Sequence, residues 1–351
     1  MPKRAPRSTG DGEVDAAIRG LLDVLGPAAN RHLVAECLTT VALLAQEDHD
    51  KLDLKITSSA LAEMRRAFAV FRPYRDKPKI TMFGSARTRP DDPMYEQARA
   101  CAARIAEAGW MVVTGAGPGI MAAGMEGAGA DLSMGVNIRL PFEQSANAFI
   151  ESDPKLVTMK YFFTRKLMLI KESDGYVVLP GGFGTLDEAF ELLTLLQTGK
   201  AEPAPVVLLD VPGGTYFQGW SRFVDEEVAS RDLVGRVDQS LYLVTDSVDV
   251  AAGEILGFYR SYSSLRYVGD RLVLRLKARP APDEVAALDT AFADICLPGQ
   301  GGFEVVGPSP AEVTEADCLD LHRLSFPFDR LQHGRLRQLI DHLNRLPSAA
   351  G

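Results

Sequence analysis

Short apolar runs alternate with amphipathic stretches between residues 78 and 262, and this alternation constrains the fold more than any other feature. The apolar runs typical of strands are KITMF (79–83), WMVVT (110–114), MGVNI (134–138), YVVLP (176–180), PVVLLD (205–210) and LYLVT (241–245). The stretches between them carry apolar residues at helical spacing. Strands separated by helices form right-handed crossovers and a mostly parallel sheet. The pattern therefore predicts a doubly wound, Rossmann-like α/β domain over residues 76–262, with ligand sites at the carboxyl ends of its strands.

The segments on either side of this domain have different patterns. Residues 14–75 contain three stretches with helical periodicity and end in a proline-containing linker. Residues 1–13 are predicted to be a disordered tail. Residues 265–346 have a β-α-β-β-α pattern, which is typical of a small α+β domain of split-βαβ character. The sequence therefore predicts a helical extension, a central α/β domain and a C-terminal α+β domain.

Length and charge exclude several classes of protein. The 351 residues carry a formal net charge of −9, whereas a protein that binds nucleic acid or anionic membranes would present a basic face. No apolar run reaches the length of about 18 residues that a membrane-spanning helix needs. The basic N-terminus lacks the apolar segment of a signal peptide. We therefore expect a cytoplasmic protein that binds neither nucleic acid nor a membrane.

The cysteines and histidines do not form a metal-binding pattern. Cys37, Cys101, Cys296 and Cys318 are far apart in the sequence, which favours isolated thiols over a disulfide framework. The five histidines lie outside the glycine-rich centre, and none is paired with a cysteine at ligand spacing. We expect no structural metal.

Three loops that contain glycine follow three of the predicted strands. The residues concerned are Gly84 and Ser85 in the first loop, Gly115, Gly117, Gly119 and Gly124 in the second, and Gly181, Gly182 and Gly184 in the third. Glycine lets the backbone approach a ligand closely. The helix N-terminus behind each loop offers free N–H groups to a phosphate. Three such loops at one sheet edge favour a nucleotide or sugar-phosphate site over tight βα turns alone.

A dinucleotide site and a P-loop are the nearest alternatives. Gly115-x-Gly117-x-Gly119 departs from G-x-G-x-x-G, and the next strand ends in Asn137-Ile138-Arg139, where an acidic residue should hold the ribose. A P-loop needs Gly-Lys-Ser/Thr, which the loops lack. We therefore do not expect NAD, and we predict no cofactor.

Glu188 and Arg165 are each open to two interpretations. Thr185-x-x-Glu188 has the spacing of a capping box, which predicts a helix that begins at Thr185. Glu188 would then lie in the first turn, where the helix dipole favours an ionised carboxylate. Glu188 is also a candidate for chemistry at the mouth of the glycine-rich loop. Arg165 is either a surface residue with a packed stem or a guanidinium held near the loops for an anion.

Arg165-Lys166, followed by PGGFGTLDE at residues 180–188, resembles the paired signature of the LONELY GUY (LOG) family, R-K and then P-G-G-x-G-T-x-x-E. The resemblance covers roughly residues 76–262 and is strongest to the longer bacterial members. Such proteins are nucleoside 5′-monophosphate phosphoribohydrolases, which release cytokinin bases or cleave AMP and related nucleotides. They are usually homodimers with the site near the subunit interface. Similar sequences have also been called lysine decarboxylases, but no lysine here has a recognisable pyridoxal phosphate setting.

The resemblance implies a role for each residue of the site. Arg165 and Glu188 would be the catalytic pair. The 5′-phosphate would be held by Gly181, Gly182, Gly184 and Thr185. The same nucleotide cleft would be lined by Gly84, Ser85, Gly115, Gly117 and Gly119. Met159 and Lys166 would touch the base or the ribose.

The implied reaction is hydrolysis of an N-glycosidic bond to free base and ribose 5-phosphate. Departure of the base leaves positive charge on C1′, which the Glu188 carboxylate would stabilise while it orients or activates water. Phosphate binding would position C1′, so a free nucleoside should be a poor substrate. The alternative is a carrier or sensor of a phosphate-bearing ligand, as in related molybdenum cofactor carriers. Arg165 together with Glu188 favours an enzyme, because a carrier needs no carboxylate beside a bound phosphate.

Overall fold

The computed structural model describes residues 7–27, 30–140 and 146–350, and the chain divides into two compact units, residues 1–65 and 66–351. The first six residues of the predicted tail lie outside the described residues. Helix α1 (Gly12–Leu25) begins inside the stretch that we predicted to be a tail. The Asp11 carboxylate accepts hydrogen bonds from the backbone N–H groups of Glu13 and Val14, which fixes this start.

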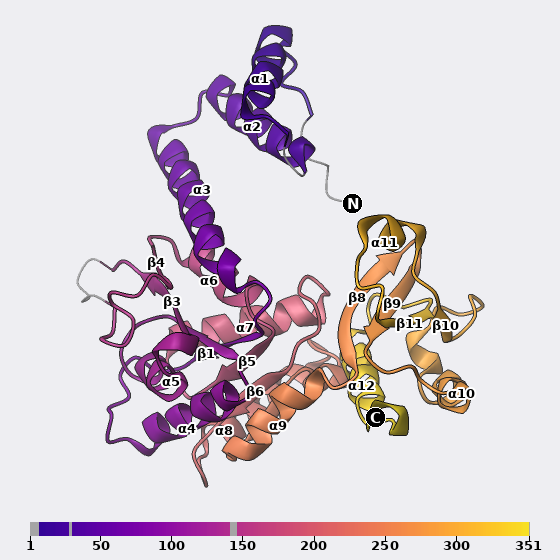
Figure 1. Cartoon of the computed structure of the whole chain (residues 1–351). Coiled ribbons are helices and arrows are strands. Elements are labelled where there is room, and N and C mark those ends of the chain that lie inside the picture. Colours follow the sequence, from indigo (N-terminus) through magenta and orange to yellow (C-terminus); the bar gives the residue numbers. More distant parts are fainter. Residues whose placement is uncertain (1–6, 28–29, 141–145, 351) are drawn as a thin grey trace. The chain divides into compact units, whose positions relative to one another are not determined.

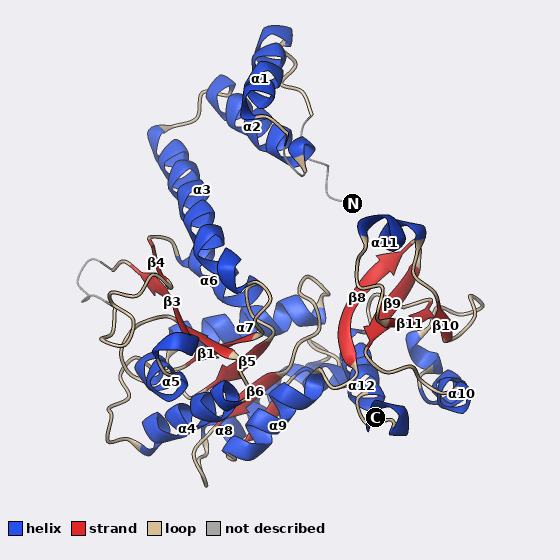
Figure 2. Cartoon of the chain, in the orientation of Figure 1, coloured by secondary structure: helices blue, strands red, loops and turns tan. Residues whose placement is uncertain are grey.

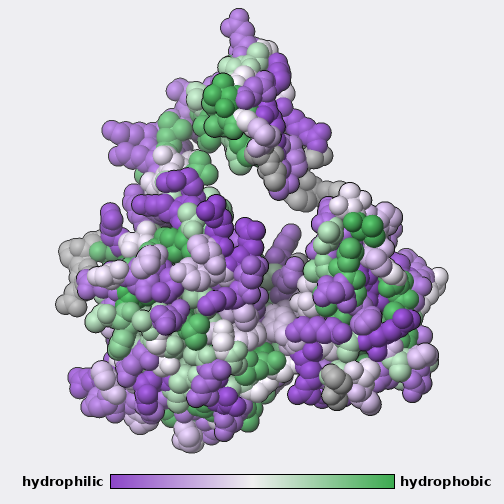
Figure 3. All heavy atoms as spheres, viewed as in Figure 1, coloured by the Kyte–Doolittle hydropathy of each residue, from purple (hydrophilic) through white to green (hydrophobic). Residues whose placement is uncertain are grey.

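Helices make up the first unit, as the periodicity of residues 14–72 predicts. Helix α2 (Arg31–Gln46) follows α1, and α3 (Lys51–Phe71) continues across residue 65 into the second unit. Leu22 in α1 and Ala60 in α3 are buried apolar residues of the described part of this unit. Large apolar side chains such as Val24 and Leu25 remain exposed, and Figure 3 shows apolar side chains on the surface of these helices.

A parallel sheet of seven strands, counted over the described residues, forms the centre of the second unit (Figures 1 and 2). The strands are β1 (Lys79–Phe83), β2 (Met111–Thr114), β3 (Ser133–Ile138), β4 (Leu156–Met159), β5 (Gly175–Val178), β6 (Val206–Leu209) and β7 (Leu243–Thr245). Their order is β4-β3-β2-β1-β5-β6-β7, and all neighbours are parallel. The chain therefore changes direction across the sheet between β1 and β5, and the predicted doubly wound fold is confirmed.

Helices cover both faces of this sheet. Alternate residues of β1, such as Ile80 and Met82, pack into an apolar core with α4 (Pro93–Glu107), α5 (Ile120–Ala128) and α9 (Val248–Phe258). Thr81 points to the other face, where its hydroxyl donates a hydrogen bond to the backbone of α6 (Phe162–Lys171). Helix α7 (Phe183–Gln197) lies beside α6 and is joined to it by ion pairs. Helix α8 (Tyr216–Phe223) follows β6.

The C-terminal part of the second unit contains a four-stranded antiparallel sheet, ordered β10-β11-β9-β8. Its strands are β8 (Tyr262–Val268), β9 (Arg271–Leu276), β10 (Glu304–Val306) and β11 (His322–Phe326). Its helices are α10 (Pro282–Ala291), α11 (Pro310–Glu315) and α12 (His333–Leu343). Every neighbouring pair is antiparallel, so this α+β unit lacks the parallel pair of the predicted split-βαβ arrangement.

Two strands, β4 and β8, were absent from the predicted set. Strand β4 has four residues, lies at the edge of its sheet and is only half buried. Strand β8 forms a hairpin with β9 through Gly269 and Asp270, and Gly269 has a φ of 60°. Glycine in a two-residue turn is a recognised hairpin signal. The hairpin also explains the antiparallel order, because it pairs β9 with its immediate predecessor.

Candidate functional site

A cavity of about 880 Å³ opens at the carboxyl ends of β1, β2 and β5, beside the point where the strand order reverses. The three predicted loops meet there, because residues 84–87, Gly115 and residues 181–188 all line its wall. Strand β1 lies between β2 and β5 in the sheet, which brings these loops together. The position is the one where doubly wound folds bind ligands, and the volume suits a small molecule.

The third loop presents the start of α7 to the cavity. Helix α7 begins at Phe183, and Gly182 occupies the N-cap position without a side-chain hydrogen bond to the first turn. The first N–H groups of a helix have no partner within the helix. An anion placed here would therefore meet free donors and the positive end of the helix dipole.

Gly182 and Gly184 leave open space in front of this helix start. A Cβ atom added to either residue would have no protein atom within 4 Å, and neither residue has a positive φ. Neither packing nor backbone conformation in the described structure therefore requires glycine at these two positions. A Cβ atom there would occupy room on the cavity wall, which is the room that a bound phosphate needs to reach the backbone N–H groups.

The glycines of the other two loops serve packing between protein segments. A Cβ on Gly84 would overlap Ile120, and one on Gly117 would overlap Met121. One on Gly119, which has a φ of 67°, would overlap the backbone of Ser85. One on Gly115 would overlap the guanidinium of Arg165. Gly115 therefore makes room for Arg165, and Gly117 and Gly119 themselves do not line the cavity wall.

Arg165 and Glu188 face each other on the cavity wall. Arg165 Nε donates to the carbonyl of Val136 at 2.8 Å, and its Nη2 donates to the carbonyl of Gly115 at 3.3 Å. These bonds hold the guanidinium against the ends of β2 and β3. Its Nη1 lies 3.7 Å from Glu188 Oε1, and the two side chains are 12% and 9% exposed. The ion pair is thus largely shielded from solvent yet borders the cavity.

Glu188 has an unusually high pKa for a glutamate. Burial raises the pKa of Glu188 to about 7, against the opposing influence of Arg165 and Lys166. Its Oε2 atom is buried and has no hydrogen-bond partner within the described residues. A carboxyl group with a pKa near neutrality, an unpaired oxygen and a position on a cavity wall is suited to proton transfer or to stabilising a developing positive charge.

The predicted capping box is wrong. The loop provides Gly182 as the N-cap, so α7 begins two residues before Thr185, and Glu188 lies in the second turn. The Thr185 side chain instead packs against Gly181, where a Cβ atom would overlap its hydroxyl. The helix dipole was expected to favour the ionised form of Glu188, but burial outweighs such influences and raises its pKa to about 7.

Lys166 and Met159 do not line the cavity. Lys166 is buried between α6 and α7, where its Nζ lies 2.7 Å from Asp187 Oδ2 and 2.6 Å from Glu191 Oε2. Met159 is 1% exposed at the end of β4. Their positions therefore do not favour the contacts with base or ribose that the resemblance implied.

Several wall residues were not predicted, among them Arg87, Phe162, Phe183 and Tyr216. Arg87 follows Ser85 by two residues, so a cation in the first glycine-bearing loop was the available signal. Phe183 occupies the variable position of the PGGFGT stretch and is 94% exposed. Tyr216 begins α8, and its hydroxyl donates to the carbonyl of Gly181 at 2.7 Å. No local pattern indicates that contact.

Two kinds of feature are absent from the described residues. No group of three or more His, Cys, Asp or Glu side chains is placed to hold a metal ion in the described parts of the chain. In the same parts, no helix has both the length and the apolar character needed to cross a membrane.

Comparison with known proteins links the site to one family. Residues 116–255 match the family model described as "possible lysine decarboxylase". A probable cytokinin riboside 5′-monophosphate phosphoribohydrolase of Arabidopsis thaliana is 42% identical over 64 residues, which are 18% of this chain and 30% of that protein. A second, from Oryza sativa subsp. japonica, is 41% identical over 64 residues, which are 18% of this chain and 29% of that protein. The chain thus spans about 30% of the length of these curated relatives.

One solved structure is also similar to part of the chain. The molybdenum cofactor carrier protein of Chlamydomonas reinhardtii is 23% identical, with a TM-score of 0.37, over 50% of this chain and 94% of that chain. The curated relatives carry LOG names, and the matched model spans both Arg165 and Glu188. The comparisons therefore support the resemblance to the LOG family over the central α/β part of the chain.

Proposed function

We propose that this protein hydrolyses the N-glycosidic bond of nucleoside 5′-monophosphates, such as AMP or cytokinin riboside monophosphates. The observation that carries the proposal is Glu188, a buried carboxyl group with an unpaired oxygen on the wall of a nucleotide-sized cavity. Its pKa of about 7 suits acid–base or electrostatic work at neutral pH. The relatives named as phosphoribohydrolases give the class of reaction.

The phosphate end of the substrate would bind at the start of α7. The uncapped N–H groups there suit an anion, and the open faces of Gly182 and Gly184 let it approach. Arg87 lies on the same wall and adds a positive charge. Binding energy from the phosphate would position C1′ for reaction, and a nucleoside without phosphate loses this positioning.

The sugar end of the substrate would lie against Glu188. Departure of the base leaves positive charge at C1′, and a carboxylate stabilises it. The oxygen of a water molecule bonds to C1′, the bond from C1′ to the base nitrogen breaks, and a proton from water ends on the base. Arg165 holds the carboxylate in place and balances its charge, since its guanidinium is itself fixed to Val136 and Gly115.

The proposal is tested by incubating the protein with AMP, other nucleoside monophosphates and adenosine, and measuring released base. We expect base from monophosphates, little from adenosine, and a loss of at least about 100-fold in Glu188→Gln. Because the ionised form of Glu188 is required, kcat/KM should rise as the pH increases through about 7. Monophosphate binding by the parent without any release of base would favour the carrier function instead.

The assembly is proposed on the same family resemblance. We infer a homodimer or a higher homo-oligomer, which light scattering at several protein concentrations tests directly. A mass equal to one chain at every concentration would contradict it.

A further inference from the structure

Lys166 lies next to the candidate catalytic pair without lining the cavity. It follows Arg165 on α6, and its buried ammonium group contacts both Asp187 and Glu191 on α7. Burial alone would lower the pKa of Lys166, but the two ion pairs raise it above its usual value, so the group stays charged. One buried cation thus joins the helix that carries Arg165 to the helix that carries Glu188.

The charges around Glu188 are nearly balanced. Two cations on α6, Arg165 and Lys166, favour its ionised form, and two acids on α7, Asp187 and Glu191, oppose it. A fifth charged residue, Arg87, reaches the cavity from the loop after β1. Lys166 is paired with both opposing acids. Its removal would take away one favourable charge and leave two unfavourable charges unscreened beside Glu188.

We propose that Lys166 is a positioning residue that neutralises Asp187 and Glu191 and so keeps Glu188 available as a carboxylate beside Arg165. This role replaces the base or ribose contact that the family resemblance implied. Its kinetic consequence rests on the proposed hydrolase function, whereas its effect on the titration of Glu188 does not.

Lys166→Met keeps an unbranched apolar stem and removes the charge. The Glu188 titration should move to higher pH by about one unit or more, as expected for loss of a nearby opposite charge. The pH profile of kcat/KM should move with it. At pH 7, kcat/KM for AMP would fall about fivefold for a one-unit shift, while at pH 9 it would approach the parent value. KM would change little.

A charge-balanced variant separates this role from two others. Lys166→Met combined with Asp187→Asn and Glu191→Gln has no bridge between α6 and α7, yet it has no unscreened acids either. We expect its pH profile to return toward that of the parent. If Lys166 only held the two helices together, the triple variant would keep the altered pH profile of Lys166→Met. If Lys166 contacted the substrate, both variants would have a higher KM and an unchanged pH profile. Either of these two results overturns the proposal.

Lys171→Met is the matched control, because Lys171 lies on the same helix and its ion pair with Glu172 is more exposed. This variant should leave the profile unchanged.

A readout without turnover keeps the two proposals distinguishable. The carboxyl carbon of Glu188 can be followed by NMR in protein labelled at glutamate, with its signal identified by its loss in Glu188→Gln. If the parent releases no base, the hydrolase function fails, but the titration in Lys166→Met still decides the role of Lys166. An unchanged Glu188 titration in Lys166→Met overturns the proposal whether or not the protein is an enzyme.

Discussion

At the scale of single residues, the burial of Glu188 links the proposed chemistry to stability. Its folded-state pKa of about 7 lies above the ordinary value of 4.5. The folded protein therefore binds this proton more tightly, and the associated stability is lost as the pH rises from about 4.5 to about 7. Glu188→Gln should be more stable than the parent at pH 8, by on the order of 3 kcal/mol. Urea unfolding at a series of pH values measures this gain. A gain that is equal at pH 5 and pH 8 would contradict the assignment.

Gly184 gives a second prediction at this scale. It lies in the first turn of α7 with an ordinary φ and open space in front of it, so Gly184→Ala adds a methyl group without internal overlap. The substitution should raise the free energy of unfolding by about 0.5–1 kcal/mol, because alanine loses less entropy in a helix. It should also weaken AMP binding, since the methyl group obstructs the phosphate. Urea unfolding measures the change in stability, and titration calorimetry measures AMP binding. Unchanged AMP affinity would argue against a phosphate site there.

The residues of the candidate site were predictable where a motif contains them and not elsewhere. Local sequence indicates the PGGFGT loop, Arg165 and Glu188. In the fold they line one cavity, where Arg165 of α6 faces Glu188 of α7. Tyr216 and Arg87 come from other strand ends, so their proximity depends on a strand order that periodicity does not reveal. The raised pKa of Glu188 could not be predicted from local sequence, because burial in the folded protein causes it.

At the scale of secondary-structure elements, the helices and strands of the α/β part were predicted with two exceptions, β4 and the start of α7, and β8 was missed at its boundary. The central helices appear where apolar residues recur at helical spacing. The start of α7 was misplaced by two residues, because Gly182 competes with Thr185 as the N-cap. Strand β8 lies across a predicted domain boundary, and the Gly269-Asp270 turn that pairs it with β9 was the available sequence signal.

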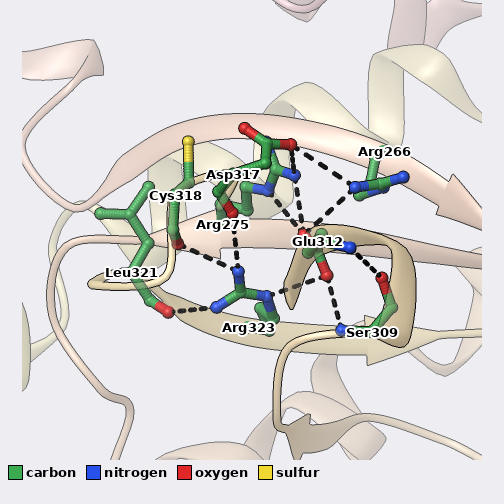
Figure 4. Close-up of polar contacts among 8 residues, drawn as sticks. All are labelled: Arg266, Arg275, Ser309, Glu312, Asp317, Cys318, Leu321 and Arg323. Atoms are coloured by element: carbon green, nitrogen blue, oxygen red, sulfur yellow. Dashed lines mark hydrogen bonds and ion pairs between the residues drawn. The ribbon is translucent and has the colours of Figure 1, made fainter. Parts of the chain in front are cut away.

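The packing of β9, β11 and α11 depends on a buried ionic cluster around Glu312 (Figure 4). Glu312 is 1% exposed, and it accepts hydrogen bonds from Arg275 at 2.7 Å and Arg323 at 3.3 Å. A further bond comes from the backbone N–H of Ser309 at 2.8 Å. Burial alone would raise the pKa of Glu312, but these bonds lower it to about 2. The stability that they contribute is present above the ordinary pKa and is lost as the pH falls from about 4.5 to about 2.

Glu312→Gln should therefore destabilise the protein by about 3–5 kcal/mol at pH 7. It leaves the buried Arg323 without its carboxylate partner and Arg275 with Asp317 alone. The difference from the parent should shrink as the pH falls toward 3. Urea unfolding at pH 7 and pH 4 measures it. Glu304→Gln is the control, because the Glu304 side chain is 57% exposed in its pair with Arg271, and surface pairs contribute about 1 kcal/mol or less. Equal losses in the two variants would contradict the argument.

At the scale of the whole second unit, the two sheets are joined through α9. Ala251 and Ile255 of this helix belong to the core of the parallel sheet, whereas its last residue, Phe258, belongs to the core of the antiparallel sheet. The sequence pattern places a boundary at residues 262–265, where the alternation of strands and helices changes. Periodicity cannot show that one helix contributes side chains to both cores. We therefore expect residues 66–351 to unfold cooperatively.

Asn344 offers the sharpest test of this cooperativity. It lies after α12, is 6% exposed, and its Oδ1 accepts hydrogen bonds at 2.9 Å from the backbone N–H groups of Ser261 and Tyr262. Its Nδ2 donates to the carbonyl of Phe258. Asn344→Ala leaves these buried groups unpaired and should cost on the order of 2–4 kcal/mol.

Both tryptophans, Trp110 and Trp220, lie in the α/β part, so their fluorescence reports on the parallel sheet and its helices. In Asn344→Ala, the urea midpoint from tryptophan fluorescence should fall together with the midpoint from far-UV circular dichroism. Leu331→Ala, at a side chain that is 87% exposed in the same C-terminal region, should move neither midpoint. An early loss of dichroism with an unchanged fluorescence midpoint would mean that the antiparallel sheet unfolds alone, and α9 would then not couple the two cores.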